Sequence, residues 1–155
     1  MKIDWKKLII CLFVPLAVGG LSAFFTRNSM EDFEQLTKPP LAPPGWLFPV
    51  VWTVLFILMG IASYLVATSN QPYKSRSALL VYGVQLIFNF LWSLIFFNLN
   101  AYTFAFIWLI ILWLLIFLTL RMFYNISKPA GLLLVPYLIW VTFAGYLNLG
   151  IAILN

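Results

Sequence analysis

Three hydrogen-bonding side chains recur every four residues within one apolar segment: Gln85, Asn89 and Ser93. In a helix this spacing puts them on one face. A polar side chain in hydrocarbon costs free energy unless it is paired, so this face should turn toward other protein. Such residues either join helices, an interaction worth about 1 kcal/mol or less, or offer hydrogen bonds to a bound molecule. Spacing alone favours the joining role.

Two aromatic or apolar stripes show helical spacing as well: Phe48, Trp52 and Phe56, and then Trp140, Ala144, Leu147 and Asn148. If these stripes converge with Asn89, they line an apolar cavity with a few hydrogen-bonding groups. That is the profile of a site for a flat hydrophobic molecule, with Trp52 and Trp140 stacked on its faces. Trp46 and Tyr102 lie near the ends of apolar runs, where belts of aromatic residues at the membrane interface are typical.

No set of residues suited to catalysis by the protein itself accompanies these stripes. The chain has no histidine, one cysteine (Cys11) and four acids, and none of the acids falls within an apolar run. A metal site and an intrinsic cofactor are therefore not expected. The lack of ionisable groups within the apolar runs also argues against an ion-driven transporter and against acid–base catalysis.

The composition predicts an all-α integral membrane protein. Of 155 residues, 64% are hydrophobic and 8% charged, with a mean hydropathy of +1.02. Soluble domains are about 45–50% apolar and about 25% charged. The apolar runs are apolar on every face, whereas membrane strands alternate. We expect a single domain over residues 1–155, a bundle of five transmembrane helices at 8–25, 46–67, 78–97, 101–123 and 131–154, the last interrupted by Pro136.

The first run also has the basic start typical of a signal peptide, which leaves two interpretations of residues 8–25 open. Its length suffices to span a bilayer, for which about 20 residues are needed. Within it, Gly19 and Ala23 form a pair of small residues that would allow close helix contact.

The basic residues indicate orientation in a bilayer. The net charge of +5 could suggest nucleic acid, but all but Arg27 and Lys38 of the nine basic residues flank the N-terminus and the second and fourth connections. Because basic residues collect on the cytoplasmic side, the N-terminus is predicted to be cytoplasmic. The lipid bilayer is thus the expected partner, and nucleic acid is not.

Residues 26–45 are predicted to connect the first two helices. More than half of the prolines of the chain lie near the end of this connection and in the first turn of the helix that follows. Five of the nine prolines fall within residues 39–52, and an ordinary helix is not expected before Pro49 is passed. Such a stiff segment could close a pocket, or could simply be a tight loop. Phe33 and Leu36, three residues apart, could dock a short amphipathic turn on the bundle.

Several short motifs occur in order along nearly the whole chain. They are Leu36-Thr37-Lys38-Pro39, Pro43-Pro44-Gly45-Trp46, Phe48-Pro49-Val50-Val51-Trp52, Asn89-Phe90-Leu91-Trp92, Phe96-Phe97, Val135-Pro136-Tyr137-Leu138-Ile139-Trp140, Phe143-Ala144 and Leu147-Asn148. In these motifs the chain resembles the TspO/MBR family, the translocator proteins once called peripheral benzodiazepine receptors, and looks like a bacterial-type member.

The resemblance implies a five-helix bundle, usually a homodimer, whose ligand cavity is closed by the first loop. Ligands of the family are porphyrins such as protoporphyrin IX, isoquinoline and benzodiazepine drugs, and sterols. We expect a porphyrin as the ligand, bound in the bacterial cell membrane. The expected site residues are Phe33, Pro43, Pro44, Trp46, Phe48, Pro49, Trp52, Phe56, Gln85, Asn89, Trp140, Phe143, Ala144, Leu147 and Asn148.

The chain departs from the family pattern at positions that bear on sterols. The family often has Trp-Tyr where Asp32 and Phe33 stand, so one hydroxyl contact from the loop is missing, and Leu41 replaces a common tryptophan. Leu149 occupies the usual tyrosine position of the sterol motif, with no basic residue after it. Sterol binding is therefore less expected than tetrapyrrole binding.

A membrane receptor or sensor for porphyrins is the leading hypothesis, possible links being tetrapyrrole transport and the stress response. A second is light- and oxygen-dependent porphyrin degradation, in which Trp52 or Trp140 would be the radical partner of the excited ligand. A tetrapyrrole or sterol carrier and a purely structural membrane protein are the remaining alternatives.

Overall fold

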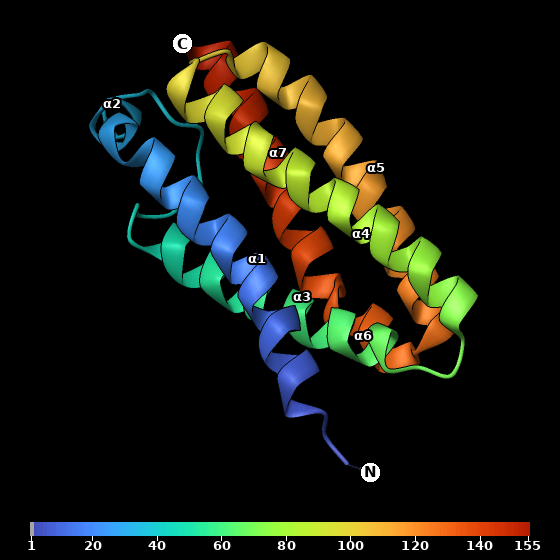
Figure 1. Cartoon of the computed structure of the whole chain (residues 1–155). Coiled ribbons are helices and arrows are strands. Elements are labelled where there is room, and N and C mark those ends of the chain that lie inside the picture. Colours follow the sequence, from blue (N-terminus) through green and yellow to red (C-terminus); the bar gives the residue numbers. More distant parts are fainter. Residues whose placement is uncertain (1) are drawn as a thin grey trace.

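Five helical segments are long enough and apolar enough to cross a membrane, which confirms the predicted all-α transmembrane fold. They are Trp5–Glu34, Leu47–Ala67, Pro72–Asn98, Tyr102–Ile126 and Lys128–Leu154. The computed structural model describes residues 2–155, and this part of the chain contains no β-strand. The segments run up and down, with the N-terminus at one end of the bundle and the C-terminus at the other (Figure 1).

The helices, in chain order, are α1 (Trp5–Thr26), the 3-10 turn η1 (Arg27–Ser29), α2 (Met30–Glu34), α3 (Leu47–Ala67), α4 (Pro72–Ser93), the π-helical turn η2 (Leu94–Asn98), α5 (Tyr102–Ile126), α6 (Lys128–Leu133) and α7 (Val135–Leu154). The main packing pairs are α1 with α3, α4 with α5, and α5 with α6 and α7. The α1–α3 pair is close because α3 has a glycine at the crossing: a Cβ on Gly60 would lie 2.9 Å from the Cys11 carbonyl oxygen.

Three predicted boundaries need correction, and proline explains two of them. The helix predicted over 78–97 begins at Pro72. The helix predicted over 46–67 spans Leu47–Ala67, so the expectation that no ordinary helix precedes Pro49 is wrong. In the first turn of a helix the N–H that proline lacks would be unpaired anyway, so proline fits there. The first helix starts at Trp5 rather than residue 8 because the Asp4 side chain caps it, accepting a hydrogen bond from Lys7 N at 3.2 Å.

The helix predicted over 131–154 consists of two pieces. It starts at Lys128 and breaks at Leu134, two residues before Pro136, so that α7 begins with the proline in its first turn. The α5–α6 connection is tight, since a Cβ on Gly131 would lie 2.7 Å from the Tyr124 Cα. The predicted interruption therefore exists, but it precedes the proline.

The connection predicted over 26–45 is partly helical, because it contains η1 and α2. Its proline-rich part packs on the C-terminal half of α7. The Tyr146 hydroxyl donates to the Pro40 carbonyl at 2.6 Å, and a Cβ on Gly150 would lie 2.6 Å from the Pro39 ring. Thr37 and Asn155 exchange two hydrogen bonds. The loop is thus held on the last helix by several contacts.

Candidate ligand-binding cavity

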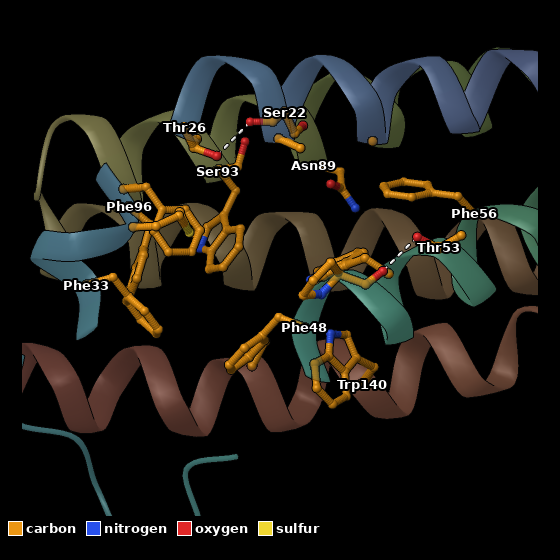
Figure 2. Close-up of a pocket in the computed structure, with 18 of the residues that line it drawn as sticks. Ser22, Thr26, Phe33, Phe48, Thr53, Phe56, Asn89, Ser93, Phe96 and Trp140 are labelled. Carbon is orange, nitrogen blue, oxygen red and sulfur yellow. Dashed lines mark hydrogen bonds between the residues drawn. The ribbon is translucent and has the colours of Figure 1, made fainter. Parts of the chain in front are cut away.

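A cavity of about 590 Å³ lies within the bundle. Its walls come from α1, η1, α2, α3, α4, η2 and α7, and no residue of α5 lines it. The structure places ten of the residues predicted for the site on these walls: Phe33, Phe48, Pro49, Trp52, Phe56, Asn89, Trp140, Ala144, Leu147 and Asn148. Phe48 and Trp140, which are 92 positions apart in the chain, therefore face the same cavity (Figure 2).

Five predicted site residues do not line this cavity. Trp46 precedes α3 and is 68% exposed, and Pro43 and Pro44 lie in the loop beside it. Gln85 is buried behind the wall, where its Oε1 accepts a hydrogen bond from the Tyr137 hydroxyl at 2.7 Å. Phe143 packs against Trp140 at 5.6 Å on the side of an outer groove between α3 and α7.

Aromatic rings form one wall of the cavity. Trp52 stacks on Phe56, with ring centroids 5.5 Å apart and planes at 28°. Phe48 packs edge-on against Trp140 at 5.8 Å. Trp140 lines both the cavity and the outer groove. The two indoles come from different spans and line the same cavity. The position of each indole is held by contact with a neighbouring aromatic ring.

Tyr137 is a residue that the sequence reasoning missed. Its hydroxyl accepts from Asn89 Nδ2 at 2.7 Å and donates to Gln85 Oε1, which joins α4 to α7. Its ring packs edge-on against Trp52 at 6.2 Å, directly behind the aromatic wall. The available signal was its place three residues before Trp140 and seven before Ala144, on the same helical face.

A second hydrogen-bond chain fixes the other end of the cavity. Trp92 Nε1 donates to Asn148 Oδ1 at 3.1 Å, and Asn148 Nδ2 donates to the Tyr102 carbonyl at 2.8 Å. Both the oxygen and the nitrogen of the Asn148 amide are therefore used in hydrogen bonds that hold α4, α5 and α7 together. Gln85 joins only α4 to α7, through the hydrogen bond that its Oε1 accepts from Tyr137. Asn89 both pairs with Tyr137 and lines the cavity.

The face that α1 presents to the cavity was also missed. It contains small and polar residues, namely Gly19, Gly20, Ser22, Ala23 and Thr26, followed by Arg27 in η1. The helix is part of the bundle, since it packs along α3 and lines the cavity. Only the small pair Gly19 and Ala23 gave a signal in the sequence.

The walls of the cavity are mostly apolar. Its surface is mostly aromatic and aliphatic, with a few amide and hydroxyl groups, and Arg27 is the single charged side chain among the described residues that line it. Hydrophobic walls with a small number of placed polar groups are the usual character of a ligand pocket. Neither a carboxylate nor an imidazole is present among the described residues on these walls.

Comparison of the sequence with those of known proteins indicates the family to which the chain belongs. Residues 11–154 match the TspO/MBR family as a whole. The chain is 41% identical over 150 residues to the "Tryptophan-rich protein TspO" of Chlorobaculum tepidum, covering 96% of this chain and 95% of that one. It is 40% identical to "Protein CrtK" of Rhodobacter capsulatus, covering 92% and 89%, and 31% identical to the "Translocator protein" of Bos taurus, covering 96% and 89%.

A match that extends over nearly the whole chain, together with five apolar spans, agrees with the resemblance seen in the loop and helix motifs. The chain belongs to the TspO/MBR family of integral membrane proteins.

Proposed function

We propose that this protein is a membrane receptor that binds porphyrins and similar planar hydrophobic molecules in the cavity of its bundle. The observation that carries the proposal is the cavity of about 590 Å³ with Trp52 and Trp140 on its walls. A volume in the range of about 300–1,000 Å³ is typical of sites for small molecules. Family membership supports a sensory or translocator role in a membrane, and the ligand class is our inference from that family and from the aromatic wall.

The flat ligand would lie against indole rings, which provide large contact areas and a preference for stacked or edge-on arrangements. Asn89 is the side-chain amide on the wall nearest to this aromatic set, held by Tyr137 in a fixed orientation. We place the protein in a bacterial cell membrane, with the N-terminus in the cytoplasm and as a homodimer, as the family resemblance and the basic residues suggest.

Quenching of tryptophan fluorescence by protoporphyrin IX in a nonionic detergent tests the proposal. Replacing both Trp52 and Trp140 by Phe should weaken binding by about fivefold or more, because each aromatic pair contributes about 0.5–1.5 kcal/mol beyond its buried area. Trp113→Phe is the matched control: its indole donates to Thr142 and does not line the cavity. An unchanged affinity in the double variant would show that the ligand lies elsewhere.

Porphyrin degradation driven by light and oxygen is a second candidate. It is favoured by the edge-on contact of Trp52 with Tyr137, because a neighbouring tyrosine can transfer an electron to an oxidised indole. The oxidation itself would be supplied by the excited porphyrin and O₂. Illuminating the complex in air should give a new absorbing product that is absent in detergent alone and reduced in Trp52→Phe. The same product without protein would end this candidate.

A further inference from the structure

Arg27 lines the cavity from η1. It is exposed, and it is the one charged side chain among the described residues that line the space. Its guanidinium lies 3.9 Å from the centroid of the Phe24 ring, and Nη1 donates to the Phe24 carbonyl at 2.6 Å. Both partners belong to Phe24 and neither is a carboxylate, so within residues 2–155 the charge is held in place without being neutralised. Arginine has five N–H donors in a planar fork, and most of them remain free.

The backbone that carries Arg27 is fixed by another span. Asn98, the last residue of η2, donates from Nδ2 to the Phe25 carbonyl at 2.9 Å. Its Oδ1 accepts from the Ser29 hydroxyl at 2.7 Å. These two bonds hold the chain on both sides of Arg27. The guanidinium is therefore presented from a turn whose position is set, which lowers the entropy lost when it binds a partner.

Other polar groups gather on the same side of the cavity. Figure 2 shows Ser22, Thr26 and Ser93 together on the side of α1 and α4, across the space from Phe48 and Trp140. The Ser22 hydroxyl oxygen is buried and has no hydrogen-bond partner among the described residues. Thr26 and Ser93 donate to backbone carbonyls of their own helices. The cavity thus has a polar, positively charged side next to η1 and an aromatic side made by α3 and α7.

We propose that Arg27 is the anion-binding residue of this cavity, and that the preferred ligands are planar apolar acids rather than neutral molecules of the same shape. The inference rests on the proposed function and narrows its ligand class. The carboxylate on one edge of the ligand pairs with the guanidinium of Arg27. The flat body lies on the wall formed by Phe48, Trp52 and Trp140. A paired guanidinium and carboxylate form parallel charge-assisted hydrogen bonds, which are stronger than neutral ones.

An anionic lipid headgroup could offer Arg27 the same chemistry through its phosphate, and the test separates the two sources. Protoporphyrin IX, which has its carboxylates on one edge, is compared with its dimethyl ester in a lipid-free nonionic detergent. Binding is measured by tryptophan quenching for the wild type, Arg27→Gln, Arg27→Lys and Arg76→Gln. Arg76 is an exposed arginine near the start of α4, far from the cavity lining, and serves as the control.

We expect the wild type to prefer the acid over the ester by about tenfold, the range of one hydrogen bond to a charged group. Arg27→Gln should abolish that preference by lowering the affinity for the acid about tenfold while leaving the affinity for the ester unchanged. Arg27→Lys should restore part of it, since lysine keeps the charge but not the fork. Arg76→Gln should behave as the wild type does.

Three outcomes overturn the proposal in different ways. If the wild type binds acid and ester equally, the receptor function stands and the role of Arg27 fails. If Arg27→Gln weakens both porphyrins to the same degree, the residue shapes the turn and does not bind the carboxylate. If neither porphyrin binds folded wild-type protein, the proposed function itself fails and this inference falls with it.

Discussion

Tyr137 links the cavity wall to the polar core of the bundle. Its hydroxyl is shared between Asn89 and Gln85, and its ring supports Trp52. All three polar residues are buried, with exposed fractions of 4% or less. Lipid cannot hydrogen-bond to a group that loses its partner, so this network sets the register of α4 against α7. The orientation of Asn89, the amide that a ligand would meet, depends on it.

Tyr137→Phe should therefore destabilise the protein while keeping the ring contact with Trp52. The change leaves Gln85 Oε1 and Asn89 Nδ2 without their partner, which should cost about 1–2 kcal/mol in the free energy of unfolding. Titration with denaturing detergent measures this cost. Tyr73→Phe is the control, because Tyr73 is 87% exposed. Equal stability of the two variants would show that the network contributes nothing.

Gly19 limits how far Phe56 extends along the cavity. A Cβ on Gly19 would lie 2.7 Å from Cδ2 and Cε2 of Phe56, so Gly19→Ala must move the ring that stacks on Trp52. We expect porphyrin affinity to fall by about fivefold, which corresponds to about 1 kcal/mol of lost packing. Gly83→Ala should bind as the wild type does, since nothing lies within 4 Å of its added Cβ and it does not line the cavity. If the two variants have the same affinity, the position of Phe56 is not important for binding.

The helices show which part of the arrangement was readable in the sequence. The existence of the five spans follows from hydropathy alone, because an apolar stretch of this length is typical of a transmembrane helix. The face that each span presents is harder to predict, because lipid is as apolar as the core. This is why the cavity-lining face of α1, a helix with only Pro15 and Thr26 buried, was not found.

The short helix α2 was missed for a different reason. Its five residues cannot form a stable helix alone, so its position depends on tertiary contacts. Phe33 packs against Phe48 at 6.0 Å and against Phe97 at 5.3 Å, rings that come from α3 and η2. The spacing of Phe33 and Leu36 predicted a docking turn, whereas its partners could be named only from the folded chain. Trp46 was placed at the site by family resemblance and is exposed instead.

The crossing of α1 and α3 gives a prediction about the elements themselves. In Gly60→Ala the new Cβ would meet the Cys11 carbonyl and the Leu12 Cα at 2.9 Å, and backbone cannot move without shifting the whole helix. The expected loss is about 1–3 kcal/mol, seen as a lower unfolding temperature in detergent. Gly83→Ala on α4 meets no atom within 4 Å and should be neutral or slightly stabilising, because alanine favours the helix. A stable Gly60→Ala protein would contradict the close packing of these two helices.

At the level of the whole molecule, charge is distributed unequally between the two ends of the bundle. The N-terminus, the α3–α4 turn and the α5–α6 turn lie toward one end, and α2, the proline-rich loop and the C-terminus lie toward the other (Figure 1). All but Arg27 and Lys38 of the nine basic residues belong to the first end. The second end has Glu31, Asp32 and Glu34 besides these two. Such asymmetry orients a protein with its basic end in the cytoplasm.

Cysteine labelling in intact bacterial cells tests this orientation. In a Cys11→Ser background, Leu41→Cys places a thiol on the proline-rich loop, where the native side chain is 83% exposed, and Asn70→Cys places one in the exposed α3–α4 turn. A membrane-impermeant maleimide should label Leu41→Cys in intact cells and Asn70→Cys only after lysis. The reverse pattern would invert the topology. Because Arg27 lies at the same end as the loop, the expected pattern would also place the charged side of the cavity away from the cytoplasm.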